Sequence, residues 1–290
     1  MRGRQELGTA LNSLYESYNR EESASDPVNL VRPFRRNDDR EIAGFCAAAL
    51  AFGRVGSVLN SIRTLFRIMG PRPAEFVRAF DPDAPHPELR EMVHRWTKGV
   101  DLVALLWILR QMVEAKGSVE NFFVEGYSTD DDDVSAALDS FSERALALDI
   151  RRAYKRVPRR PGVCYFFPRP SKGSACKRLN LYLRWMVRSD EIDLGVWTRV
   201  SAGKLIVPLD THVIRLGRCL RLTRYRSPGW RMAADITASL RALNPADPVR
   251  FDFSLCHVGM MNACGYGRKQ GDSQCPLRGL CRPRRNRLGV

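Results

Sequence analysis

The chain has 290 residues, 44% of them hydrophobic, which is enough for one large or two modest domains with a substantial core. No segment approaches the roughly 20 consecutive apolar residues that cross a bilayer, and the first residues lack the apolar core of a secretory signal. The formal net charge is +15, from 47 Lys and Arg against 32 Asp and Glu. We therefore expect a cytoplasmic protein without a membrane partner, and a polyanionic partner such as nucleic acid. A GC-rich genome that encodes Arg wherever a surface cation is needed is the alternative explanation of the charge.

Helical periodicity dominates the first half of the chain. Apolar residues such as Leu7, Leu11 and Leu14 mark an amphipathic opening segment within residues 1–37. Two acids, Asp38 and Asp39, precede the next apolar helix, where they suit the positive end of its dipole. The predicted helices of this half cover residues 42–52, 58–69, 75–80, 100–113 and 134–154.

The second half continues in the same way. A turn over residues 166–173 leads into a predicted helix, and an apolar link over residues 200–207 leads into another. The predicted helices of this half cover residues 174–187, 211–222, 230–243 and 249–263. Because no alternating strand pattern and no internal repeat appears, the sequence predicts an all-α fold.

A lone acid follows the apolar run Leu205 to Leu209. Asp210 lies where a helix begins, so its carboxylate can accept a hydrogen bond from an unpaired N–H group of the first turn. Val213, Leu216 and Leu220 follow at helical spacing and would form the buried face. By itself this pattern is typical of a well-capped helix.

A turn that contains proline and glycine precedes the predicted helix over residues 174–187. The segment Pro170-Ser-Lys-Gly173 would point backbone N–H groups outward at the helix N-terminus, which favours phosphate binding. Lys177 follows in the first turn, where the helix dipole disfavours its positive charge and would make the amine a better nucleophile. A solvated surface cation is the ordinary alternative for such a lysine.

The order of these features resembles the helix-hairpin-helix DNA glycosylase superfamily of endonuclease III. The resemblance rests on the hairpin, on Lys177 and on the segment Pro208-Leu-Asp-Thr-His-Val-Ile-Arg215, and it covers about residues 38–285. The segments Gly-Ser-Ala-Cys-Lys-Arg-Leu-Asn and Leu-Arg-Trp-Met-Val-Arg look like an uncharacterised bacterial branch. The resemblance implies a barrel-like helical domain over residues 38–188 that includes the hairpin. Residues 1–37 and 189–290 would form a second helical domain with a cysteine-rich C-terminal loop.

The resemblance implies base-excision repair of double-stranded DNA with a damaged base, by a monomeric glycosylase with or without AP-lyase activity. Asp210 would stabilise the positive charge that develops on the sugar, and Lys177 would attack the sugar carbon to form a Schiff base. The base would leave the stack and enter a pocket between the domains, where Phe52, Arg54 and Trp107 are candidates to stack on it. The spacing of 33 residues from Lys177 to Asp210 is long, as in archaeal 8-oxoguanine glycosylases, and favours an oxidised purine.

The hairpin departs from the usual Leu-Pro-Gly-Val-Gly pattern. It reads Arg169-Pro-Ser-Lys-Gly173, and Lys177 lies two residues later than the common position, so Lys172 is an alternative nucleophile. These departures leave open a non-catalytic DNA- or RNA-binding protein that retains the glycosylase fold. The DNA contacts implied by the resemblance are Lys172, Gly173, Ser174, Arg178, His212 and Arg215.

The last four cysteines lie close together near the C-terminus. The superfamily binds a [4Fe–4S] cluster through Cys-x6-Cys-x2-Cys-x5-Cys, and this chain follows that outline with Asp in the second place. The matching residues are Cys264, Asp272, Cys275 and Cys281. Cys256 is the other candidate for the fourth ligand, but an unbroken helix would hold it about 12 Å from Cys264. Zinc bound by three cysteines with an acid or His257, as in a metal-dependent regulator, and a loop without metal are the alternatives.

Overall fold

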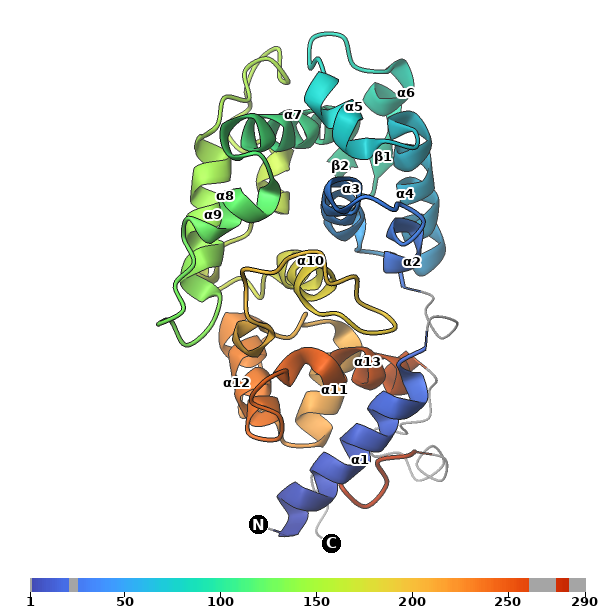
Figure 1. The fold of residues 1–290 in the computed structure, drawn as a ribbon, viewed down its shortest axis with the longest axis vertical. Coiled ribbons are helices and arrows are strands. Elements are labelled where there is room, and N and C mark those ends of the chain that lie inside the picture. The colour runs from blue at the N-terminus through green and yellow to red at the C-terminus, as the bar shows by residue number, and fades with distance from the viewer. Residues whose placement is uncertain (1, 21–25, 261–274, 282–290) are drawn as a thin grey trace, which may run out of the picture.

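The computed structural model describes residues 2–20, 26–260 and 275–281, and helices form most of them, which confirms the all-α prediction. Figure 1 shows an upper and a lower group of helices with α10 (Lys177–Val187) between them. The upper group contains α2 (Val28–Val31), α3 (Asn37–Leu50), α4 (Val55–Met69), α5 (Pro73–Ala79), α6 (Pro87–Glu91), α7 (Gly99–Lys116), α8 (Val119–Val124) and α9 (Ser135–Ala147). The lower group contains α1 (Arg2–Tyr18), α11 (Thr211–Cys219), α12 (Trp230–Arg241) and α13 (Asp252–Met260).

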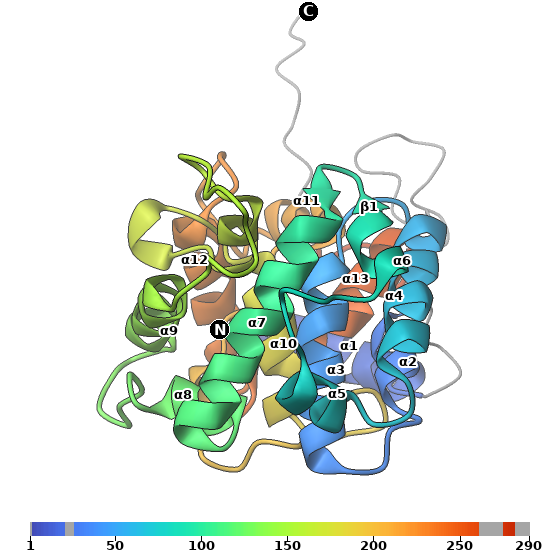
Figure 2. The same cartoon turned by 90° about the horizontal axis from the view of Figure 1, so that it is seen from above.

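Short 3-10 helices connect several of these elements. They are η2 (Gly162–Phe166), η3 (Pro170–Lys172), η4 (Ala202–Lys204) and η5 (Pro248–Phe251). Seen from above, α3 and α7 lie over α10 (Figure 2). No helix in the described part of the chain is both long and apolar enough to cross a membrane.

The alanine-rich helix α3 forms the centre of the upper group. Its small side chains are buried and allow α5 and α10 to pack closely against it. A Cβ atom at Gly44 would lie 2.7 Å from Cε of Met186, so α10 packs closely against α3 at this glycine. Glu41, on the same helix, accepts hydrogen bonds from the first N–H groups of α8 and from the indole of Trp197 at 2.8 Å. Burial raises the pKa of Glu41, and these donors partly offset the effect.

One small β-hairpin was not predicted. Strands β1 (Val93–His94) and β2 (Thr97–Lys98) pair antiparallel, with Val93 opposite Lys98 and His94 opposite Thr97. Two residues per strand are too few for an alternating pattern to be recognised in the sequence. The two-residue turn is Arg95-Trp96, in which Arg95 has φ of 56°, a left-handed conformation that such turns usually assign to Gly, Asn or Asp.

The predicted helices match the structure over their central residues, whereas several of their predicted ends are wrong. Helix α10 begins at Lys177 rather than residue 174 because Cys176 has φ of 47° and cannot continue a right-handed helix. Helix α9 ends at Ala147 rather than residue 154, since Leu148 is extended.

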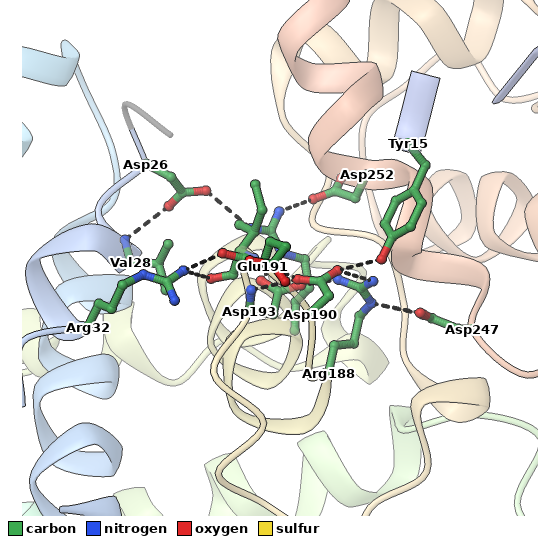
Figure 3. Close-up of polar contacts among 12 residues, drawn as sticks. Tyr15, Asp26, Val28, Arg32, Arg188, Asp190, Glu191, Asp193, Asp247 and Asp252 are labelled. Atoms are coloured by element: carbon green, nitrogen blue, oxygen red, sulfur yellow. Dashed lines mark hydrogen bonds and ion pairs between the residues drawn. The ribbon is translucent and has the colours of Figure 1, made fainter. Parts of the chain in front are cut away.

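A buried set of ion pairs joins α10 to the lower group (Figure 3). Arg184 of α10 binds three carboxylates: its Nε lies 3.1 Å from Asp193, its Nη1 2.6 Å from Asp252, and its Nη2 3.1 Å from Asp26. The guanidinium and the carboxylates of Asp193 and Asp252 are almost fully buried. Arg184 therefore connects α10 with the loop after it, with α13 and with the segment before α2.

A second arginine extends this set to the N-terminal helix. Arg188 pairs with Asp190 at 2.8 Å and with Asp247 at 2.9 Å, and it also contacts Asp193. The hydroxyl of Tyr15 on α1 donates a hydrogen bond to Asp190 at 3.1 Å. We call these two arginines and the five carboxylates that they bind the ionic network. Its members are Asp26, Arg184, Arg188, Asp190, Asp193, Asp247 and Asp252.

Candidate functional site

The turn before α10 has the form that its proline and glycine predict. Gly173 follows η3 with φ of 80°, the left-handed conformation that favours glycine. Asp139 of α9 holds one side of the turn, because it accepts hydrogen bonds from Ser171 N at 3.1 Å and from Ser171 Oγ at 2.7 Å. On the other side, the backbone N–H of Trp230 donates to the carbonyl of Gly173 at 3.2 Å. The turn is therefore fixed between α9 and α12.

The two candidate nucleophiles lie on either side of this turn. Lys177 is the first residue of α10 and its side chain is half-buried, whereas Lys172 ends η3 and is exposed. Cys176, just before Lys177, is buried, and its thiol donates to the carbonyl of Pro168 at 3.4 Å. Ser174 Oγ accepts a hydrogen bond from Cys176 N at 3.2 Å, so this serine supports the turn from inside.

Asp210 caps α11, as its position in the sequence predicts. Its Oδ1 accepts a hydrogen bond from Val213 N at 2.7 Å, and its backbone is extended, as an N-cap requires. The second oxygen has a partner that was not predicted: Cys256 Sγ of α13 lies 3.0 Å from Asp210 Oδ2. These two residues are 46 positions apart, so no local spacing in the sequence could have revealed the contact.

The thiol of Cys256 is a neutral donor to this carboxylate. Burial, followed by the negative charge of Asp210, raises the pKa of Cys256 far above the ordinary thiol value. The thiol therefore keeps its proton and directs it at Asp210 Oδ2. Cys256, the other candidate for the fourth metal ligand, thus has its thiol hydrogen-bonded to Asp210.

Helix α13 connects the two candidate catalytic residues indirectly. Asp252 at its start binds Arg184 of α10, and Cys256 one turn later binds Asp210 at the start of α11. Among the described residues, no hydrogen bond or ion pair joins Lys177 to Asp210. Both α10, which begins with Lys177, and α11, which begins after Asp210, are therefore bound to α13.

The predicted DNA contacts near Asp210 are only partly open to solvent. The ring of His212 is half-buried against α13, where a Cβ atom at Gly259 would lie 2.6 Å from His212 Cβ. Its Nδ1 is buried without a hydrogen-bond partner in the described structure. Arg215 is half-buried on the same helix, α11.

Arg178 is engaged inside the protein rather than free for a phosphate. Its guanidinium donates to the carbonyl of Ala49 at 3.1 Å and to that of Tyr165, and it stacks 5.0 Å from the ring of Phe52. Burial lowers its pKa to about 10. Two of its nitrogens already donate to main-chain oxygens, and the direct DNA contact stays a prediction.

The three residues predicted to stack on a base have different surroundings. Trp107 is buried in α7 and its indole N–H donates to the carbonyl of Asp149 at 2.7 Å, so the prediction is wrong for this residue. Phe52 is half-buried beside an exposed Trp96, with ring centroids 4.7 Å apart. Arg54 is exposed directly before α4.

Two of the four predicted metal ligands lie outside the described residues, namely Cys264 and Asp272. The other two lie on one short turn, where Cys275 is buried and Cys281 is half-buried. Within the described ranges, no three His, Cys, Asp or Glu side chains are grouped as metal ligands would be. Because half of the predicted set is outside these ranges, the iron–sulfur cluster stays a prediction.

Comparison with known proteins adds one finding. Residues 26–261 match a family model whose description is "Protein of unknown function (DUF2400)". No curated protein and no solved structure matches the chain. The matched segment includes the hairpin, Lys177, Asp210 and Cys256.

Proposed function

The chain belongs to the DUF2400 family, and we propose that it is a DNA glycosylase that removes a damaged base through Asp210 and Lys177. The observation that supports this proposal most is the environment of the Asp210 carboxylate. One oxygen accepts from a backbone N–H and the other from the thiol of Cys256. Neither donor carries a charge, and no Lys or Arg pairs with Asp210 among the described residues.

Such a carboxylate suits the chemistry of base removal. When the bond between a base and C1′ of its sugar breaks, positive charge develops on the sugar, as in other glycosidic cleavages. A carboxylate that is held in place and not neutralised by a cation stabilises this charge without reorganising. Asp210 would take this role, with the Cys256 thiol as a positioning group.

Lys177 would supply the amine for a bifunctional reaction. The lone pair of its neutral Nζ would form a bond to C1′ as the bond to the base breaks and the base leaves with the bonding electrons. Loss of a proton from Nζ and opening of the sugar ring would then give a Schiff base. Lys177 is the better candidate than the exposed Lys172 because it is half-buried in the first turn of α10.

The proposed substrate is double-stranded DNA with a damaged base, with an oxidised purine as the first candidate. The formal charge of +15 favours a polyanion, and the positive end of α10 follows the fixed turn.

The proposal includes a [4Fe–4S] cluster that would be held by Cys264, Cys275 and Cys281 with Asp272. Such a cluster would shape the loop and take no part in the reaction. Iron and sulfide content and visible absorbance of anaerobically purified protein test this part.

The activity is tested with duplexes that carry 8-oxoguanine, thymine glycol, uracil or an alkylated base, followed by borohydride trapping. We expect base release, and a covalent complex that is lost in Lys177→Gln but kept in the matched control Lys172→Gln. Asp210→Asn should lower base release by about 10²- to 10⁴-fold. Asn caps a helix as well as Asp does, so this variant should fold and bind DNA as the wild type does.

The alternative is the non-catalytic nucleic-acid-binding protein. If no damaged base is released by the wild type, while wild type and Asp210→Asn bind DNA equally well, the glycosylase proposal is wrong and the alternative is supported. A covalent complex that is lost in Lys172→Gln instead would reassign the nucleophile.

A further inference from the structure

Three aromatic rings from separate parts of the chain form a row beside the start of α10, in which two of the rings are exposed and one is half-buried. Phe52 lies between α3 and α4, Trp96 lies at the tip of the β-hairpin, and Tyr165 lies in η2. The ring centroids of Phe52 and Trp96 are 4.7 Å apart, and those of Trp96 and Tyr165 are 6.3 Å apart. Trp96 is 53% exposed and Tyr165 is 58% exposed. We call these three rings the aromatic row.

Contacts from His94 and Arg178 support the aromatic row. The His94 ring packs edge-on against Phe52 at 4.6 Å, and its nitrogens lie 2.9 Å from Ser61 Oγ and 2.9 Å from the carbonyl of Phe52. Arg178 binds the carbonyl of Tyr165 and stacks on Phe52. These contacts hold the Phe52 ring and the main chain at Tyr165 in place, which reduces the entropy lost when a ligand binds.

Two arginines accompany the rings. The guanidinium of Arg95 lies 5.4 Å from the ring of Trp96, and Arg54 is exposed next to Gly53. A Cβ atom at Gly53, whose φ is 114°, would lie 2.9 Å from Cδ of Arg95, so glycine makes room for this side chain. Arg95 itself has a left-handed φ of 56°, a conformation that is unfavourable for a side chain of this size. This local strain presents the Arg95-Trp96 pair at the tip of the hairpin.

We propose that the aromatic row binds single-stranded DNA, with bases stacked on Trp96 and Tyr165 and phosphates near Arg95 and Arg54. Rings that alternate with guanidinium groups match this ligand, because every base has a face to stack and every linkage carries a negative charge. The inference deepens the proposed function and rests on it in taking DNA as the partner. Arg178, which stacks on Phe52, is in the first turn of α10 with Lys177, so the bound strand would run beside the turn that carries the proposed nucleophile. The unpaired DNA would be the strand opened around the damaged base.

A second copy of the chain fits this surface less well. With a formal charge of +15, two copies repel each other, and exposed arginines beside the aromatic row would face like charges. A polyanion removes this repulsion and covers the exposed rings. The charge of the chain therefore favours nucleic acid over self-association here.

The binding test uses undamaged, fluorescently labelled oligo(dT), whose anisotropy reports binding by the wild type and by every variant, together with the tryptophan fluorescence of the wild type, so it requires no chemistry at Lys177 or Asp210. Of the five tryptophans, Trp107, Trp185 and Trp197 are buried and Trp230 is half-buried, which leaves Trp96 as the ring most open to a stacked thymine. We expect oligo(dT) to quench the wild-type fluorescence. Trp96→Ala and Tyr165→Ala should each weaken binding by about tenfold or more.

Three further variants make the result specific. Trp96→Phe keeps a ring and should retain most of the affinity, and Arg95→Gln should reduce the dependence of binding on salt. The matched control is Tyr225→Ala, which removes a ring that also has an arginine stacked on it, Arg224 at 5.3 Å, but between α11 and α12. This control should bind as the wild type does.

The outcomes separate this inference from the proposed function. Binding of the labelled oligo(dT) that is specifically weakened in Trp96→Ala supports the aromatic row even if no damaged base is ever released. Wild type that fails to bind oligo(dT), or Trp96→Ala that binds it unchanged, overturns the inference even if base release is observed. A wild-type dimer that Trp96→Ala dissociates, with DNA binding unaffected, would assign the surface to self-association instead.

Discussion

At the residue scale, burial and neighbouring carboxylates raise the pKa of Asp252. Within the described residues, Arg184 and Arg188 are the two cations of the ionic network and face five carboxylates, those of Asp26, Asp190, Asp193, Asp247 and Asp252. Two cations face five buried or half-buried carboxylates, and the pKa values of the most buried ones, Asp193 and Asp252, are raised. Burial raises the pKa of Asp252 to about 7 from an ordinary value of 3.8, against the opposing effect of Arg184. The negative charge of Asp210 adds to the increase.

Asp252→Asn should therefore change how stability depends on pH. Because the pKa of Asp252 is higher in the folded protein, the stabilisation is complete below about pH 4 and is lost as pH rises towards 7. Asparagine mimics the protonated form. Relative to wild type, the variant should gain up to about 1.4 kcal/mol per pH unit over this window. Urea unfolding of both proteins at pH 5, 6, 7 and 8 measures the difference, from which the histidine contributions cancel. A difference that stays constant would mean that Asp252 is ionised throughout.

Of the two hydrogen bonds that Asp210 accepts, only one could be predicted from the sequence. Its role as an N-cap was predicted because the acceptor and the donor, Val213 N, are three residues apart. Its second hydrogen bond was not, because Cys256 comes from another helix. The same holds for Arg178, whose bonds to the carbonyls of Ala49 and Tyr165 come from other elements and could not be predicted from the sequence.

At the element scale, the packing of α11 against α13 depends on one small residue. Helix α13 presents Gly259 to the ring of His212, and the missing side chain lets the two helices approach. This approach also brings Cys256 of α13 within hydrogen-bond distance of Asp210 at the head of α11. The position of the candidate catalytic carboxylate therefore depends on a glycine about one turn away from its donor.

Gly259→Ala should destabilise the protein by about 1–3 kcal/mol, because the new methyl group would overlap His212 in a packed interface. The matched control is Gly56→Ala in α4, where a Cβ atom meets nothing within 4 Å. There the change should stabilise the helix by up to about 1 kcal/mol. Chemical unfolding of the two variants beside the wild type gives both values. Equal stability of Gly259→Ala and wild type would contradict the close approach of the helices.

The elements themselves were predictable to different degrees. Long amphipathic or apolar segments such as α4 and α7 follow from the period of their apolar residues. The β-hairpin was missed because strands of two residues carry no period and Arg95-Trp96 is not a usual turn sequence. The aromatic row depends on this hairpin and could not have been foreseen without it.

At the scale of the whole molecule, the ionic network joins segments that lie far apart in the sequence. Arg184 of α10 holds carboxylates from before α2, from the loop after α10 and from α13. Arg188 adds η5 through Asp247, and α1 through the link from Asp190 to Tyr15. The upper and lower groups of helices are thereby coupled through a single helix.

Arg184→Met should lower the free energy of unfolding by about 3–5 kcal/mol, since it leaves buried carboxylates without their cation. The matched control is Arg72→Ala, which breaks an exposed pair with Glu75 and should change stability by less than about 1 kcal/mol. Urea unfolding followed by circular dichroism measures both changes. A loss as small as that of the control would mean that the network contributes little to stability.

The sequence by itself determined the helices, the strongly basic character, the turn before α10 and the cap at Asp210. These depend on interactions between residues at most a few positions apart, or on composition, and both can be read along the chain. Only the tertiary structure decided that Cys256 binds Asp210, that Arg178 is internal, and that Trp96 and Tyr165 lie side by side. The link from Tyr15 to Asp190 spans 175 positions. Contacts of this kind depend on how whole helices pack, and no local pattern of residue types encodes which distant side chains will meet.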